Sequence, residues 1–143
     1  MEEIQVEKDI PVVMVKADLF PDGVMEAHRK LHSLVPYSAS RRYFGISWPD
    51  RNGNIQYYAG VETLNSEDAH ISGTEPFTIH QGPYACLTIH DYMKDLQGIG
   101  NAFTTLLELE DLDQNGYCLE WYVSDKEVRC MVPLLRESKT VRQ

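Results

Sequence analysis

The stretch from Gly116 to Pro133, GYCLEWYVSDKEVRCMVP, predicts a β-hairpin with one acidic side chain inside an apolar strand. Successive strand residues point to opposite faces of a sheet, so Leu119 and Trp121 share one face. Glu120 and Tyr122 share the other face. A short polar break follows, and the alternation then resumes up to Pro133, as expected of a returning strand.

Upstream of this hairpin, strand and helix patterns occur twice in the same order. Apolar residues at alternate positions predict strands, and apolar residues at steps of three and four predict helices. In chain order the patterns predict a strand over 4–20, a helix over 22–35, a hairpin over 42–63, a polar linker over 64–73, strands over 77–91, a helix over 99–107 and the final hairpin.

Two pairs of matching residues suggest that the two series are copies. Asp22 and Asp95 precede the two helices, Trp48 and Trp121 lie in the two hairpins, and each pair is 73 positions apart. We therefore predict an α+β fold made of a tandem pair of strand-helix-strand-strand units, half 1 at about 4–63 and half 2 at about 74–134. Each antiparallel sheet carries a helix on one face, and the two halves enclose a central groove.

The alternation assigns side chains to the two faces of each predicted sheet. On the helix-covered face we expect Phe44, Ile46, Ala85, Leu87, Ile89, Leu119, Trp121 and Val123. Facing the groove we expect Tyr43, Tyr58, Tyr84, Glu120 and Tyr122.

Composition restricts the class of protein. A chain of 143 residues with 43% hydrophobic content supports a single domain. Its net charge of -9 opposes nucleic-acid binding, and no DNA-binding segment precedes Ile4, so we expect neither DNA binding nor transcription-regulator activity in a single polypeptide. Three cysteines without paired spacing, no signal peptide and no membrane-length apolar run predict a cytoplasmic protein that does not enter membranes.

Five short segments resemble a known family. They are YFGI at 43–46, YYAGV at 57–61, IHQGPYA at 79–85, LEWY at 119–122 and MVPL at 131–134. Their order and spacing are similar to those of the gyrase-inhibitor-like (GyrI-like) small-molecule-binding domains, which also serve as effector-binding modules of multidrug-sensing transcription regulators. The resemblance extends from about Pro11 to Leu134.

The resemblance implies a tandem pair of strand-helix-strand-strand (SHS2) units around a groove. The family's groove acid, which meets cationic drugs in the sensor members, maps onto Glu120. Some stand-alone members hydrolyse electrophilic, cyclopropane-bearing genotoxins with the same acid and groove aromatics. Ligand-binding candidates are therefore Glu120, Tyr122, Tyr84, Tyr58 and Tyr43, and Glu120 is also the candidate catalytic residue.

Each candidate has an alternative interpretation. Glu120 is either a functional acid or the structural partner of Arg129, and the tyrosines are either ligand contacts or ordinary strand residues. His28 and His32, spaced i and i+4, match a surface pair better than a zinc site, because no glutamate follows His28. We expect neither a metal nor a cofactor.

Three functions remain open at this point. The first is a promiscuous binder of flat, apolar, cationic small molecules, with Glu120 as counter-charge and tyrosines as stacking walls. The second is a hydrolase in which Glu120 activates water and Tyr84 or Tyr122 assists the leaving group. The third is an acidic modulator of a protein partner such as a topoisomerase.

Overall fold

The computed structural model describes residues 1–135, which form two compact units. The α1 unit contains Ile10–Ile79, and the α2 unit contains Met1–Asp9 together with the chain from His80 onward. Each unit combines one α-helix with antiparallel strands. This confirms the predicted α+β class with antiparallel sheets and two helices.

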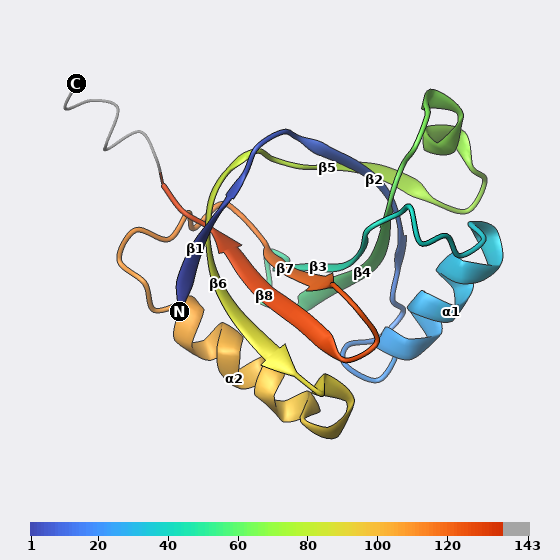
Figure 1. Cartoon of the computed structure of the whole chain (residues 1–143). Coiled ribbons are helices and arrows are strands. Elements are labelled where there is room, and N and C mark those ends of the chain that lie inside the picture. Colours follow the sequence, from blue (N-terminus) through green and yellow to red (C-terminus); the bar gives the residue numbers. More distant parts are fainter. Residues whose placement is uncertain (136–143) are drawn as a thin grey trace. The chain divides into compact units, whose positions relative to one another are not determined.

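The α1 unit has its strands in the order β3-β4-β2-β5. Its helix α1 lies against β2 and β4 and buries Ala27 and Leu31 (Figure 1). The elements are β2 (Ile10–Lys16), α1 (Val24–Leu34), β3 (Tyr43–Pro49), β4 (Ile55–Glu62), the 3-10 helix η1 (Ser66–His70) and β5 (Glu75–Ile79).

The α2 unit has its strands in the order β1-β6-β8-β7. Its helix α2 runs along β6 and β8 and buries Ala102 and Leu106 (Figure 1). The elements are β1 (Glu2–Val6), β6 (Gly82–His90), the 3-10 helix η2 (Tyr92–Lys94), α2 (Leu96–Leu106), β7 (Cys118–Tyr122) and β8 (Glu127–Pro133).

The edge strands pair differently from what the chain order suggests. The sequence predicts one strand over 4–20, whereas the structure has two strands there, β1 and β2. β1 precedes β2 in the chain but pairs with β6, and β5 precedes β6 but pairs with β2. The edge strand β1 of the α2 unit is therefore followed in the chain by β2 of the α1 unit. The edge strand β5 of the α1 unit is likewise followed by β6 of the α2 unit.

The two hairpins share one register. Ile46 is opposite Tyr58 in the first hairpin, and Leu119 is opposite Met131 in the second. Trp48 is likewise opposite Gln56, and Trp121 is opposite Arg129. All four residues of the second hairpin lie 73 positions after their counterparts. The predicted repeat is therefore visible in the pairing, and the two tryptophans occupy equivalent positions in it.

The helix-covered face is partly different from the predicted one. Ala85, Leu87 and Ile89 pack in the α2 core as predicted. The prediction was wrong for four residues that lie on the opposite face. The helix-covered cores instead contain strand residues of the other alternation, such as Tyr57, Ala59, Val128 and Cys130. The four residues on the opposite face are Phe44, Ile46, Leu119 and Trp121. Val123 lies beyond β7 and is exposed.

The physical reason is that both faces of each sheet are apolar. Phe44 is 1% exposed, Ile46 is 0% exposed and Leu119 is 1% exposed, although they lie on the faces that point away from the helices. Strand alternation separates the two faces of a sheet, but it does not say which face a helix covers.

Candidate ligand-binding site

The acidic residue of the last hairpin lies on the helix-covered face of β7. Glu120 is half-buried and directly opposite Cys130, which is part of the core that α2 covers. Tyr122 lies two residues further along the same face and donates its hydroxyl hydrogen bond to Oε1 of Glu120. The prediction that Glu120 and Tyr122 share one face of the strand is confirmed. The predicted face, the one away from the helix, was wrong.

The neighbours of Glu120 experience its negative charge. Burial and then the Glu120 carboxylate raise the pKa of the Cys130 thiol to about 12, so this cysteine stays a neutral thiol. The ring of Tyr92, from η2, lies 5.5 Å from the ring of Tyr122 at 58° between planes. Burial raises the pKa of Tyr92, and the charges of Asp125 and Glu120 raise it further. The carboxylate therefore lies among apolar and aromatic groups.

Arg129 does not lie on the same face of the hairpin as Glu120, as it would if the two residues formed a structural pair. It is directly opposite Trp121, on the face of the hairpin that points away from Glu120. Its guanidinium carbon lies 4.8 Å from the centre of the Trp121 ring, and its Nε lies 3.9 Å from the Glu127 carboxylate. The hypothesis that Glu120 is present to pair with Arg129 was therefore wrong.

Tyr84 is buried, and its hydroxyl is hydrogen-bonded to other groups of the protein. It is 1% exposed, and its hydroxyl donates to the backbone carbonyl of His80 at 2.7 Å. The same oxygen is 2.7 Å from the Tyr117 hydroxyl, which accepts a hydrogen bond from the His80 amide at 2.9 Å. Burial raises the pKa of Tyr84, followed by the hydrogen bond with Tyr117. This network fixes the chain at the start of β6.

The two remaining tyrosines lie in the α1 unit, in separate ring stacks. Tyr43 was predicted to face the groove, but this was wrong, because it packs against the α1 core, with the rings of His32 and Tyr37 stacked on it at 5.2 Å and 5.3 Å. Tyr58 lies on the other face and stacks on Trp48 at 4.9 Å. Of the five predicted ligand-binding residues, the structure thus brings Glu120 and Tyr122 into direct contact.

Tyr92 is the neighbour that sequence analysis missed. It directly follows the predicted strands over 77–91, in a segment that has neither strand nor helix periodicity. The only available signal was an aromatic side chain close to a helix start. Its position depends on a backbone hydrogen bond from its amide to the carbonyl of Lys126, 3.2 Å long, which no local pattern reveals.

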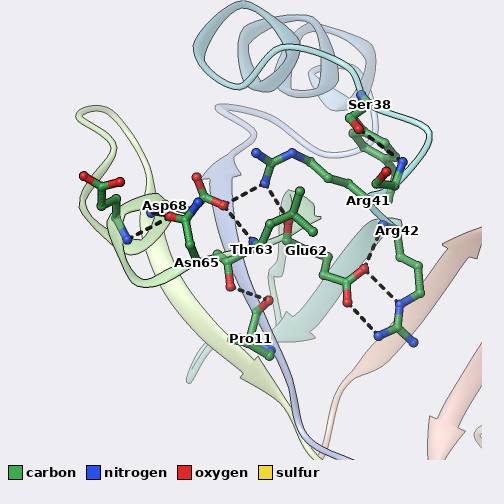
Figure 2. Close-up of polar contacts among 12 residues, drawn as sticks. Pro11, Ser38, Arg41, Arg42, Glu62, Thr63, Asn65 and Asp68 are labelled. Atoms are coloured by element: carbon green, nitrogen blue, oxygen red, sulfur yellow. Dashed lines mark hydrogen bonds and ion pairs between the residues drawn. The ribbon is translucent and has the colours of Figure 1, made fainter.

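A buried ion pair holds the linker of the α1 unit in place. Arg41 Nη1 lies 2.9 Å from a carboxylate oxygen of Asp68, and the same nitrogen donates to the carbonyl of Glu62 at 3.0 Å (Figure 2). Asp68 also accepts from the amide of Leu64 at 2.7 Å. Asn65 accepts hydrogen bonds from two η1 amides. The linker, expected to be merely polar, is therefore specifically attached.

Residues 1–135 contain neither a cluster of metal-ligating side chains nor a helix that could span a membrane. No group of three or more histidine, cysteine or acidic side chains there is arranged to hold a metal ion. His28 instead lies 2.8 Å from the hydroxyl of Tyr57 through its Nε2. In the same part of the chain, no helix is long and apolar enough to cross a membrane.

Comparisons with known proteins identify a fold without identifying a family. No family model matches the chain, and no curated protein matches it. Among solved structures, an integron cassette protein from the mobile metagenome of Vibrio cholerae is similar, with a TM-score of 0.71 and 11% identity over 94% of this chain and 95% of the other.

Two further solved structures share this fold. The structure of SAV2435 bound to tetraphenylphosphonium has a TM-score of 0.67 and 13% identity, over 96% of this chain and 95% of the other. A hydrolase from Listeria innocua has a TM-score of 0.57 and 13% identity, over 94% and 90%. At these identities the likeness establishes the fold alone.

Proposed function

We propose that the chain is a single GyrI-like ligand-binding domain that binds apolar cations, with Glu120 as the counter-charge. The observation that carries this proposal is the half-buried Glu120 carboxylate, held by the Tyr122 hydroxyl among aromatic and apolar side chains. A carboxylate in such surroundings loses hydration, and an attached cation offsets that loss by Coulomb attraction. Bulky organic cations are favoured because they are themselves weakly hydrated.

Two further observations support the choice of a cation. SAV2435, which shares the fold, is bound to tetraphenylphosphonium, a cation that carries four aromatic rings. The chain itself has a net charge of -9, which attracts cations at long range. Cation–π contacts contribute about 0.5 to 2 kcal/mol each when desolvated. Two such contacts plus apolar burial can reach about -8 kcal/mol, which corresponds to roughly micromolar affinity.

Exchanging Glu120 for glutamine tests the role of its charge. We expect Glu120→Gln to weaken the binding of tetraphenylphosphonium about tenfold or more, roughly 1.4 kcal/mol, because the amide keeps the shape of the carboxylate but loses its charge. Triphenylphosphine oxide, which is neutral and carries similar rings, should lose little affinity. Isothermal titration calorimetry of both compounds measures the difference.

The matched control is Glu110→Gln, which removes the same charge from an exposed position of the α2 unit. It should leave both affinities within about twofold of the wild type, because exposed charges are screened by salt. An equal loss for Glu110→Gln and Glu120→Gln would show that net charge matters and that Glu120 is not the counter-charge.

A hydrolase is the second candidate, favoured by the hydrogen bond between Tyr122 and Glu120. In this scheme water attacks an electrophilic carbon, Glu120 accepts a proton from that water, and the bond to the leaving group breaks. The Tyr122 hydroxyl turns from Glu120 to protonate the leaving group, and the proton on Glu120 then returns to the tyrosine oxygen. The fold is shared with a hydrolase from Listeria innocua. Here Glu120→Gln should preserve affinity and slow turnover of a cyclopropane-bearing alkylating compound by roughly two to four orders of magnitude.

A further inference from the structure

The segment that joins β6 to α2 contains an unusual backbone conformation. Asp91 has φ of 52°, the only positive φ at a non-glycine residue within residues 1–135. Side chains with a β-carbon occupy this left-handed region at a cost in free energy, and such positions persist where the surroundings determine them. Asp91 directly precedes Tyr92 at the start of η2, so its backbone conformation contributes to the position of the Tyr92 ring.

Both ends of this segment are held by hydrogen bonds. The Tyr92 amide donates to the carbonyl of Lys126, in the turn that follows β7, at 3.2 Å. At the other end, the Asp95 side chain accepts from the amide of Gly98 at 3.1 Å and caps α2. The Tyr92 ring is therefore held against Tyr122, the residue that donates to Glu120.

We propose that Tyr92 makes the Glu120 site selective for cations that carry aryl groups over cations of similar size that carry alkyl groups. This inference rests on the proposed function. The rings of Tyr92 and Tyr122 meet at 58°, so their faces are not parallel. A tetrahedral aryl cation presents rings in several directions and can make edge or face contacts with both tyrosines. An alkyl cation retains the attraction to Glu120 but lacks the ring contacts.

The test compares two phosphonium cations of equal charge. Affinities for tetraphenylphosphonium and tetrabutylphosphonium are measured by calorimetry for the wild type, Tyr92→Leu, Tyr92→Phe and Glu120→Gln. We expect Tyr92→Leu to reduce the preference for the aryl cation about fivefold, the scale of one aromatic contact. Tyr92→Phe, which retains the ring, should rescue the preference. Glu120→Gln should weaken both cations together.

Tyr92 also packs against the α2 core, so Tyr92→Leu can reduce stability. Asp91→Val supplies a second route, because a β-branched residue opposes the left-handed conformation while the tyrosine remains. We expect Asp91→Val to lower the preference for the aryl cation as Tyr92→Leu does. Asp91→Gly, which accepts the left-handed conformation, should keep the preference of the wild type. A purely structural role would lower the melting temperature without changing the ratio of the two affinities.

The outcomes separate the two proposals. An unchanged ratio in folded Tyr92→Leu or Asp91→Val, with both cations weakened by Glu120→Gln, overturns the selectivity role and leaves the binding function standing. If the wild type binds neither cation, or Glu120→Gln changes neither affinity, the proposed cation site is wrong and the selectivity role falls with it.

Discussion

Replacing Asp68 with alanine is expected to lower the free energy of unfolding by about 3 to 5 kcal/mol, which corresponds to a fall in melting temperature of roughly 10 to 17 °C. The side chains of Arg41 and Asp68 are 14% and 12% exposed, so the substitution leaves the arginine charge largely buried without its carboxylate. The Leu64 amide also loses its acceptor. Thermal and urea unfolding measure the loss.

A double variant separates the pair from the packing around it. Adding Arg41→Met to Asp68→Ala should restore part of the lost stability, because removing both charges costs less than leaving one buried. Glu67→Ala, at an exposed neighbouring position of η1, should change stability by less than about 0.5 kcal/mol. If Asp68→Ala and Glu67→Ala behave alike, the ion pair does not hold the linker.

Acidification is expected to destabilise the protein through His28. Burial, and secondarily the charge of His32, lower the pKa of His28 to about 4 from an unfolded value of 6.5. Folding thus favours the neutral form of His28. Its contribution to the stability of the protein is fully present above pH 6.5 and is lost as the pH falls toward 4. The loss amounts to about 1.4 kcal/mol at pH 5.5 and about 3 kcal/mol at pH 4.

The measurement compares urea unfolding of the wild type and His28→Gln between pH 7 and pH 4. Glutamine can still hydrogen-bond the Tyr57 hydroxyl but does not titrate, so the difference between the two proteins isolates the histidine. We expect the stability of the wild type, relative to the variant, to fall with decreasing pH. Parallel pH profiles would contradict the lowered pKa of His28.

Local patterns predicted the elements of this fold well, because their causes are local. The Gly116–Pro133 hairpin exists as two strands with a turn at Ser124, whose hydroxyl accepts from the amides of Lys126 and Glu127. The two helical stripes were also recognisable, since a helix with one buried face repeats every three or four residues. The short 3-10 helices η1 and η2 were missed because they lack such a period, and the predicted strand over 4–20 is divided into β1 and β2.

The candidate site was predictable in part for the same reason. Glu120 and Tyr122 lie two residues apart on one strand, so their proximity follows from strand geometry alone. The roles of Tyr84 and Tyr43 depended on partners distant in sequence: Tyr84 is 33 positions from Tyr117, with which it shares a hydrogen bond. Tyr43 stacks on His32, from a helix that precedes it. No local pattern contains those partners.

The amino-acid sequence by itself determined the kinds of element, their repeated order and the presence of one acid in an apolar strand, because alternation and helical spacing are properties of neighbouring residues. Only the tertiary structure decided that β1 pairs with β6 and β5 with β2, and that helix α2 covers the face carrying Glu120. Those choices depend on which apolar surfaces meet, and each sheet here has apolar residues on both faces.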